Sequence, residues 1–209
     1  KKGPNGPPSG PRYGLFATFE KRVGSFVEAL SKKLAPGAFR GNTTVTRLEQ
    51  TRDAWRLRLQ DGKVIEADAV ILAVPSVVAA KLLEELDPTL ARLLAQTPYS
   101  DVATVNVAVR RDRLKHPLNG FGFVVPALEN RTVTGCTFSS VKFTGRAPRG
   151  QALLRAFVGG PALTGSDDEL KVAVIKDLKD YLGLDGSPEW MEIRRYPAAM
   201  PQYMLGHVD

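Results

Sequence analysis

Hydrophobic and polar residues alternate most clearly between residues 45 and 75, and this stretch predicts a set of consecutive strands. Residues 45–49 form a short β-prone run, and residues 55–60, WRLRLQ, alternate apolar with polar side chains. Such alternation is typical of a strand that is buried on one face only. Asp61-Gly62 then predicts a tight turn into a return strand, because glycine tolerates the positive φ that a hairpin requires.

The end of this stretch has a different pattern. Residues 69–74, AVILAV, are apolar without any alternation. Continuous apolar runs of this length are typical of strands that are buried on both faces, as in parallel sheets. Pro75 follows and ends the run, because proline cannot donate a backbone hydrogen bond to a neighbouring strand. The sequence therefore predicts a hairpin that leads into a buried parallel strand at 69–74.

Helices are predicted where a capping residue precedes apolar residues at helical spacing. Ser25 with Glu28, and Ser166 with Glu169, have the spacing of capping boxes. Further helices are expected after Ser76 and after Asp87-Pro88, and the longest helix is expected to end at Gly183. Between these helices lie further β-prone runs at residues 102–109, 120–126, 132–139, 152–158 and 189–196. The fold class is therefore α+β or α/β.

Composition limits the classes of protein to consider. The chain has 209 residues, of which 43% are hydrophobic, so it can bury a sizeable core. No apolar run approaches the roughly 20 residues that cross a bilayer, and the Gly/Pro-rich residues 1–12 contain no secretory signal. The net charge of +7 comes from scattered basic residues. We expect a cytoplasmic protein with no nucleic-acid partner and possible peripheral contact with the inner face of the cell membrane.

Residues that could perform chemistry alone are few. His116 and His207 are far apart and lack metal-ligand spacing, so no metal site is expected. The single cysteine, Cys136, lies in a β-prone run, where a buried and inert thiol is expected. The sequence contains no GxSxG nucleophile motif and no glycine-rich phosphate-binding loop. No residue is therefore assigned a catalytic role from the residue pattern.

The 45–75 stretch resembles the middle segment of the FAD-dependent amine oxidase superfamily. The strand pair, Asp61-Gly62, the Glu66-Ala67-Asp68 step and the run AVILAVP carry this resemblance. In that superfamily the last strand belongs to the flavin domain, and the chain then crosses to a substrate domain. Upstream, residues 19–34 resemble the turn and helix near the flavin, with Val23-Gly24 where members have paired glycines.

Further motifs, in order and in approximate spacing, resemble the protoporphyrinogen oxidases within this superfamily. They are Gly120–Pro126 (GFGFVVP), Phe138–Phe143 (FSSVKF), Arg146–Pro148 (RAP), Phe157–Gly160 (FVGG) and Pro201–His207 (PQYMLGH). The resemblance extends from about residue 13 to the end of the chain. It implies an FAD-dependent oxidase that converts protoporphyrinogen IX to protoporphyrin IX in haem biosynthesis.

Such an enzyme passes six electrons from its substrate to oxygen or another acceptor, and its cofactor carries the demanding chemistry. The resemblance implies that Val124 and Thr137 form walls of an apolar slot for the macrocycle, and that Phe157 packs against a pyrrole ring. It also implies that Val45 meets the adenine end of FAD through its backbone and that Val208 lies beside the flavin. Members commonly have an aliphatic residue at the position of Thr137 and often an aromatic one at that of Val208.

The resemblance also divides the chain into domains. Residues 1–12 are expected to be a disordered segment, 13–75 part of an FAD-binding domain, 76–199 a substrate-binding domain with a mixed or antiparallel sheet and covering helices, and 200–209 a return toward the FAD-binding domain. The glycine-rich N-terminal unit and the C-terminal flavin-contacting segment of the family are not in this sequence. We therefore expect the isolated chain to bind FAD weakly or not at all and to be inactive.

Two alternatives remain beside this hypothesis. The same fold could act on coproporphyrinogen III, which carries two more carboxylates, or serve another flavin amine oxidase such as a carotenoid desaturase. The β-rich section could also be a non-catalytic module that binds a tetrapyrrole or a partner protein.

Overall fold

The computed structural model describes residues 18–20 and 22–206, and its described residues form two compact units. The first unit contains the residues up to Leu30 and Asp101–Pro197, and we call it the five-stranded unit. The second contains Ser31–Ser100 and the residues from Ala198 onward, and we call it the three-stranded unit.

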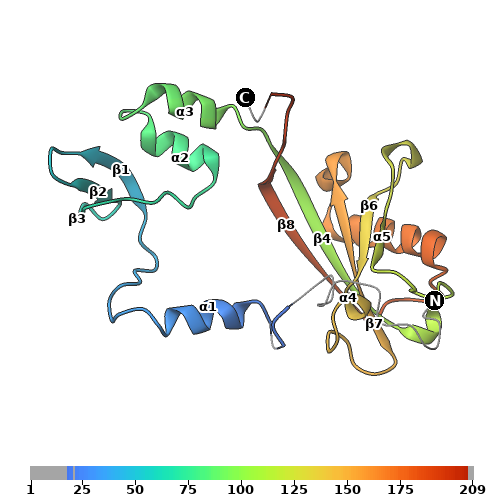
Figure 1. Cartoon of the computed structure of the whole chain (residues 1–209). Coiled ribbons are helices and arrows are strands. Elements are labelled where there is room, and N and C mark those ends of the chain that lie inside the picture. The colour runs from blue at the N-terminus through green and yellow to red at the C-terminus, as the bar shows by residue number, and fades with distance from the viewer. Residues whose placement is uncertain (1–17, 21, 207–209) are drawn as a thin grey trace, which may run out of the picture. The chain divides into compact units, whose positions relative to one another are not determined.

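The five-stranded unit is built on one sheet with the strand order β5-β6-β7-β4-β8 (Figure 1). Its strands are β4 (Tyr99–Arg110), β5 (Gly122–Val124), β6 (Val133–Phe138), β7 (Gln151–Gly159) and β8 (Trp190–Pro201). Strand β5 pairs with β6, β6 with β7, and β7 with β4, all antiparallel. Its helices are α1 (Gly24–Ser31), α4 (Ser139–Lys142) and α5 (Asp167–Leu182), with short 3-10 turns at 111–113, 127–129 and 160–164.

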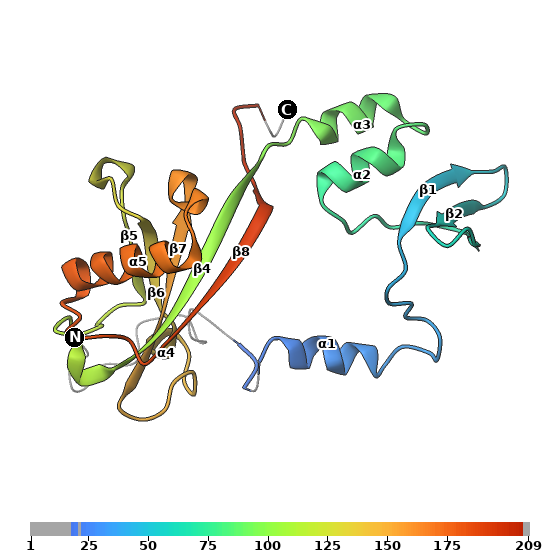
Figure 2. The same ribbon diagram turned by 180° about the vertical axis from the view of Figure 1, so that it is seen from behind.

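The core of this unit lies between the sheet and α5, which Figure 2 shows crossing one face of the sheet. Alternate residues of β7 point inward and are fully buried, as are alternate residues of β4, which is why both segments read as strands in the sequence. Helix α5 adds apolar residues at helical spacing. The buried set is Ala103, Val105, Val107, Val109, Val133, Cys136, Phe138, Ala152, Leu154, Ala156, Val158, Leu170, Val174, Leu178 and Leu182.

Helix α5 has the two ends that its sequence predicts. The Ser166 hydroxyl accepts a hydrogen bond from the Glu169 backbone N–H, and the Ser166 N–H donates to the Glu169 carboxylate at 2.8 Å, which completes a capping box. The Ser166 backbone N–H and the Ser166 hydroxyl both donate to this carboxylate, and they lower the pKa of Glu169 because they favour its ionised form. Gly183 ends the helix at φ 60°, and its N–H donates to the Lys179 carbonyl.

A buried carboxylate joins α5 to the sheet. The pairing of β6 with β7 shifts register between Val133 and Gly135, so the ladder is irregular there. Asp177 is 4% exposed, and its Oδ2 accepts a hydrogen bond from the Val133 N–H at 2.9 Å. Its other oxygen accepts a bond from Arg131, which also pairs with Asp180. Asp177 therefore satisfies a backbone donor that the irregular ladder does not.

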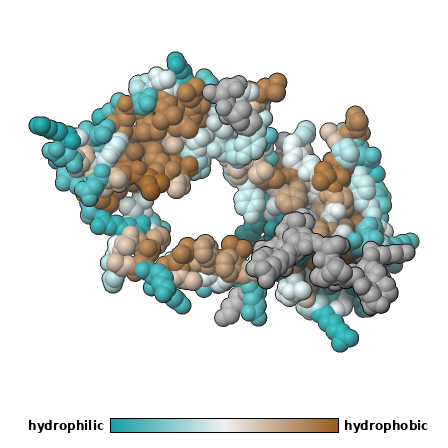
Figure 3. All heavy atoms as spheres, in the orientation of Figure 1, coloured by the Kyte–Doolittle hydropathy of each residue, from teal (hydrophilic) through white to brown (hydrophobic). Residues whose placement is uncertain are grey.

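The three-stranded unit contains an antiparallel meander, β1 (Val45–Gln50), β2 (Trp55–Leu59) and β3 (Val64–Ala67), followed by helices α2 (Ser76–Leu83) and α3 (Pro88–Ala95). The predicted turn at Asp61-Gly62 is confirmed, with Gly62 at φ 83°. Helix α3 begins as predicted, since the Asp87 carboxylate accepts from the Leu90 N–H and proline occupies the first turn. Figure 3 shows extensive apolar surface on this unit.

Two local predictions are wrong. Residues 69–74 form no strand, and Ile71 is 92% exposed. A strand needs at least one hydrogen-bonded neighbour, and among the described residues the sheet ends at β3. Ser25 forms no capping box, because α1 begins at Gly24 and the Ser25 hydroxyl donates to the Arg22 carbonyl, while Glu28 pairs with Arg22.

The predicted fold class, α+β or α/β with a mixed or antiparallel sheet and covering helices, is confirmed, and the paired strands are antiparallel. The compact units divide after Ser100, whereas the sequence places its domain boundary at Pro75. The assignment of the units to a flavin domain and a substrate domain stays a prediction, and residues 1–12 lie outside the described residues. Within residues 18–20 and 22–206, no helix has the length and apolar character needed to span a bilayer.

Candidate functional site

The five-stranded sheet has one face on the core and a second face that α5 does not cover. In β7 the even-numbered residues from Ala152 to Val158 are buried in the core, so the odd-numbered residues point to the other side. We call this second side the open face. Phe157 lies on it and is half-buried, which shows that its ring is not part of the core.

The three predicted slot residues come together on the open face. Val124 of β5 is paired with Gly135 of β6, and Gly135 is paired in turn with Phe157 of β7. Residues paired across antiparallel strands point to the same side, so Val124 and Phe157 flank Gly135 in one row. Thr137 lies two residues farther along β6 and therefore points to the same side. The register thus joins residues that are distant in the sequence.

The middle of this row carries no side chain. Gly135 would place a Cβ 3.2 Å from the Phe123 carbonyl oxygen, a tight approach. With glycine there, a strip of backbone separates Val124, which is 84% exposed, from the ring of Phe157. Val124 and the half-buried ring of Phe157 therefore present apolar side chains on either side of Gly135, which is itself buried.

Gly122, which belongs to the Gly120–Pro126 motif, also has a structural role. Gly122 is paired with Thr137 at φ 152°, and a Cβ there would lie 2.1 Å from the Cys136 carbonyl oxygen. Only glycine fits this approach between β5 and β6. The glycine therefore fixes the strand that presents Val124.

A charged residue on the open face was missed by the sequence analysis. Arg155 is exposed and lies between Leu153 and Phe157 on the outward side of β7. Its Nε donates a hydrogen bond to Oδ1 of Asn106 at 2.9 Å, and Asn106, in β4, is itself 9% exposed. The signal that could have found Arg155 is the alternation of residues 152–158, where a cation stands at an outward position of an apolar strand.

A pocket of about 270 Å³ lies beside Val124 and is also lined by His116, Phe123 and Tyr181. His116 is half-buried, and its Nδ1 accepts a hydrogen bond from the Leu118 N–H. The Tyr181 hydroxyl is buried and has no hydrogen-bond partner among the described residues. Its ring packs against Phe123 at 5.3 Å.

The thiol of Cys136 is on the core side of β6 and is 2% exposed. Burial raises its pKa to about 12, because the thiolate would lie in an apolar environment. The predicted inert thiol is confirmed by this position, and Cys136 is not a nucleophile candidate. Among residues 18–20 and 22–206, no three His, Cys, Asp or Glu side chains are close enough to hold a metal ion.

The predicted cofactor residue Val45 belongs to the three-stranded unit. Val45 is the first residue of β1, is half-buried and pairs with Leu59. A cavity of about 350 Å³ adjoins it, lined mainly by polar residues. They include Arg40, Asn42, Thr43, Thr44, Gln60, Asp61 and Lys63. Val208 lies outside the described residues.

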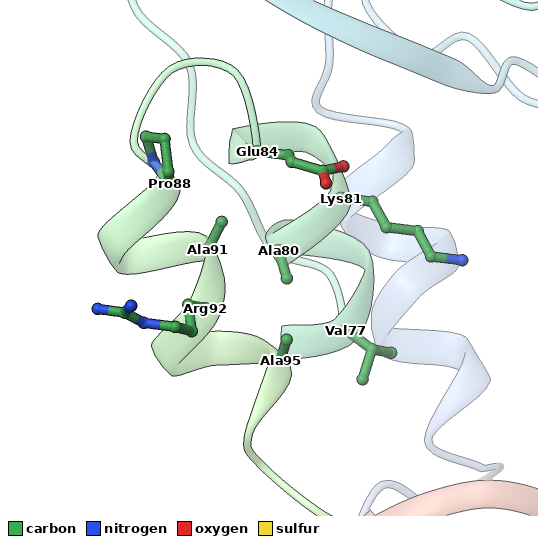
Figure 4. Close-up of a pocket in the computed structure, with 8 residues that line it drawn as sticks. All are labelled: Val77, Ala80, Lys81, Glu84, Pro88, Ala91, Arg92 and Ala95. Carbon is green, nitrogen blue, oxygen red and sulfur yellow. The ribbon is translucent and has the colours of Figure 1, made fainter.

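A shallower groove of about 400 Å³ separates α2 and α3 (Figure 4). Ala80, Ala91 and Ala95 point into the space between the two helices, while Lys81 and Arg92 extend away from it. Small side chains allow the two helices to approach each other closely. None of the predicted site residues lines this groove, so it is not the candidate site.

The chain was compared with known families and proteins. The pattern of the family described as flavin containing amine oxidoreductase matches residues 12–209. The chain is 36% identical over 211 residues to coproporphyrinogen III oxidase of Propionibacterium freudenreichii, covering 96% of this chain and 38% of that protein. It is 31% identical over 214 residues to chloroplastic protoporphyrinogen oxidase 1 of Arabidopsis thaliana, covering 95% and 40%.

The structure is similar to a crystal structure from Exiguobacterium sp. 255-15 that is assigned as a protoporphyrinogen oxidase. The TM-score is 0.77 at 29% identity, over 91% of this chain and 42% of that one. The chain therefore spans about two fifths of the length of these relatives.

Proposed function

The chain belongs to the flavin-containing amine oxidoreductase family, and on this premise we propose that it forms part of an FAD-dependent porphyrinogen oxidase. The open face of the five-stranded sheet is one wall of the substrate slot. The observation that carries the proposal is the row formed by Val124, Gly135 and Phe157, with Thr137 beside it. Oxidation of protoporphyrinogen IX to protoporphyrin IX is the reaction that this wall serves.

The chemistry of the face suits this role. Removal of six electrons from a macrocycle requires that the ring be held flat against the redox cofactor, and FAD supplies the electron acceptor when it is bound. The residues of the open face supply apolar contact and orientation rather than proton transfer, which agrees with the absence of a nucleophile or base on this row among the described residues. The electrons then pass to oxygen or another acceptor.

The cavity beside Val45 fits one end of the cofactor. Its cations, amides and hydroxyls, among them Arg40, Asn42 and Lys63, are suitable hydrogen-bond donors to ribose and phosphate oxygens. The sequence contains no glycine-rich dinucleotide loop to hold the pyrophosphate. We therefore propose that the 209-residue chain by itself retains FAD weakly or not at all. Stoichiometric flavin absorbance near about 450 nm in the purified chain would contradict this.

The slot proposal is tested with the full-length enzyme of which we propose this chain is a part, purified with its bound flavin. We call it the protein as encoded. The Phe157→Ala substitution is expected to lower kcat/KM for protoporphyrinogen IX about tenfold or more, because it removes the aromatic contact beside the ring. Porphyrin fluorescence measures the product. Phe39→Ala, at an exposed phenylalanine of the three-stranded unit, is the control. Equal rates for wild type and Phe157→Ala would overturn the proposal.

Coproporphyrinogen III is the second candidate substrate, and a specific observation favours it. The cation Arg155 lies on the same face as the predicted slot residues, and coproporphyrinogen carries more carboxylates than protoporphyrinogen. Several similar proteins are also named coproporphyrinogen III oxidase. Direct competition between the two porphyrinogens in the protein as encoded decides between them.

A further inference from the structure

Arg155 is an exposed cation on the open face of the sheet. Across the sheet it is paired with Thr137 on one side and with Asn106 on the other. Along β7 it is two residues from Phe157, so the two Cα atoms are about 6.5 Å apart and both side chains point to the same side. A flat molecule that covers Phe157 and Thr137 would therefore bring its rim next to Arg155.

The guanidinium of Arg155 is positioned by a buried amide. Asn106 stands in β4 between the buried Val105 and Val107, on the outward side of the strand. Its Oδ1 accepts the Nε–H of Arg155, which satisfies a buried acceptor and orients the guanidinium. A guanidinium bound through Nε has its two terminal nitrogens directed toward other groups.

Arg155 also differs from about half of the other arginines of the described chain in having no carboxylate partner. Exposed arginines such as Arg56, Arg110 and Arg194 each pair with a carboxylate of the protein. No ion pair within residues 18–20 and 22–206 includes Arg155. Its charge is thus not neutralised by a carboxylate in the described structure, and the planar fork matches a carboxylate ligand in geometry as well as charge.

We propose that Arg155 binds a peripheral carboxylate of the porphyrinogen and favours the substrate with more carboxylates, and that Asn106 is its positioning residue. This inference rests on the proposed function, because it places the macrocycle on the open face. Coproporphyrinogen has a carboxylate on each of its four pyrrole rings, whereas protoporphyrinogen has them on two. A single cation at the rim can therefore meet a carboxylate in more orientations of coproporphyrinogen.

The test compares the two substrates in the protein as encoded. The Arg155→Gln substitution is expected to lower the ratio of kcat/KM for coproporphyrinogen III to that for protoporphyrinogen IX about tenfold, since a charge-assisted bond to the carboxylate is lost. Arg56→Gln removes the same charge from an exposed arginine of β2 and should leave the ratio unchanged. An unchanged ratio in Arg155→Gln would overturn the proposal.

Binding provides a readout that does not depend on turnover. Coproporphyrin III, protoporphyrin IX and the tetramethyl ester of coproporphyrin III are titrated against each variant, with the porphyrin absorbance band as the signal. Arg155→Gln should weaken the binding of coproporphyrin most and leave the ester unaffected, because the ester has no carboxylate. Equal weakening of all three ligands would contradict a carboxylate contact and indicate a change in the shape of the face.

The positioning role of Asn106 is tested by separate variants. Asn106→Ala should weaken coproporphyrin binding without affecting the ester, and Arg155→Lys should restore part of the substrate ratio, since it keeps the charge and loses the fork. An ester affinity that falls together with that of coproporphyrin would show a merely structural role for Asn106. Phe157→Ala separates the two proposals, because it should lower kcat/KM for both substrates alike. If only Phe157→Ala has an effect, the slot stands and the role of Arg155 fails.

Discussion

The two units of the chain differ in how completely they bury their apolar side chains. In the five-stranded unit the inward residues of β4 and β7 are fully buried, because α5 covers that face of the sheet. In the three-stranded unit Leu48 and Leu59 are buried, but Ile71 is 92% exposed and the run that contains it forms no strand. The difference shows that an apolar pattern indicates which segments are stabilised by burial. Whether a segment is buried depends on another segment that packs against it.

The largest effect that separates the two units is expected from a pair of core truncations. Leu154→Ala should lower the free energy of unfolding of the five-stranded unit by about 3 kcal/mol, because it leaves a cavity in a sealed core. Ile71→Ala should change the free energy of unfolding of the three-stranded unit by less than about 0.5 kcal/mol, since the side chain has no cover to lose. Urea unfolding of the five-stranded unit is followed through Trp190 in a Trp55→Phe background, and that of the three-stranded unit through Trp55 in a Trp190→Phe background. Equal losses would break the comparison between the units.

The same contrast explains how far the sequence could predict the fold. Alternation identified β4 and β7, and capping residues identified both ends of α5, because these signals are local and their partners lie within the unit. The run at 69–74 has an equally strong signal, but its hydrogen-bonded neighbours are not among the described residues. A pattern of residues predicts which backbone tends to extend and does not supply the strands that would pair with it.

The candidate site was predictable only in part for a related reason. Resemblance suggested Val124, Thr137 and Phe157, and the structure places all three on one face. Their proximity depends on strand register, which no single segment of sequence encodes. Arg155 was missed because its significance comes from its cross-strand neighbour Asn106, which is far away in the sequence.

The approach between β5 and β6 provides a second way to test how tightly the five-stranded unit is built. Gly122→Ala should cost about 3 kcal/mol, because the new Cβ would lie 2.1 Å from the Cys136 carbonyl oxygen and the strands would have to separate. Gly120→Ala is the matched control, since a Cβ there meets nothing within 4 Å. Unfolding is followed by Trp190 fluorescence as before. Full stability of Gly122→Ala would show that β5 is not held to β6 as described.

Substitutions at the buried carboxylate of α5 test whether the packing of this helix against the sheet depends on a polar contact. Asp177→Ala should cost about 2 kcal/mol, because it leaves the buried Val133 N–H without an acceptor. Asp180→Ala, which removes the more exposed carboxylate that Arg131 contacts, should cost much less. Asp177→Asn should lie between them, since its amide oxygen can still accept the bond. If Asp180→Ala were the more damaging variant, the ion pair and not the backbone contact would hold α5 to β6.

Cys136 offers a final and smaller test, because it reports opening of the five-stranded unit without changing its stability. Burial raises the thiol pKa to about 12, so its contribution to stability is fully present below the unfolded thiol pKa of roughly 8.5 and is lost as the pH rises from there toward 12. At pH 8, a thiol reagent should modify native Cys136 at least about 100-fold more slowly than the urea-unfolded chain. Leu154→Ala should speed this reaction, whereas Ile71→Ala should not. Rapid modification of the native wild-type chain would mean that the core of the five-stranded unit is open to solvent. The five-stranded unit would then not be the better-packed of the two units.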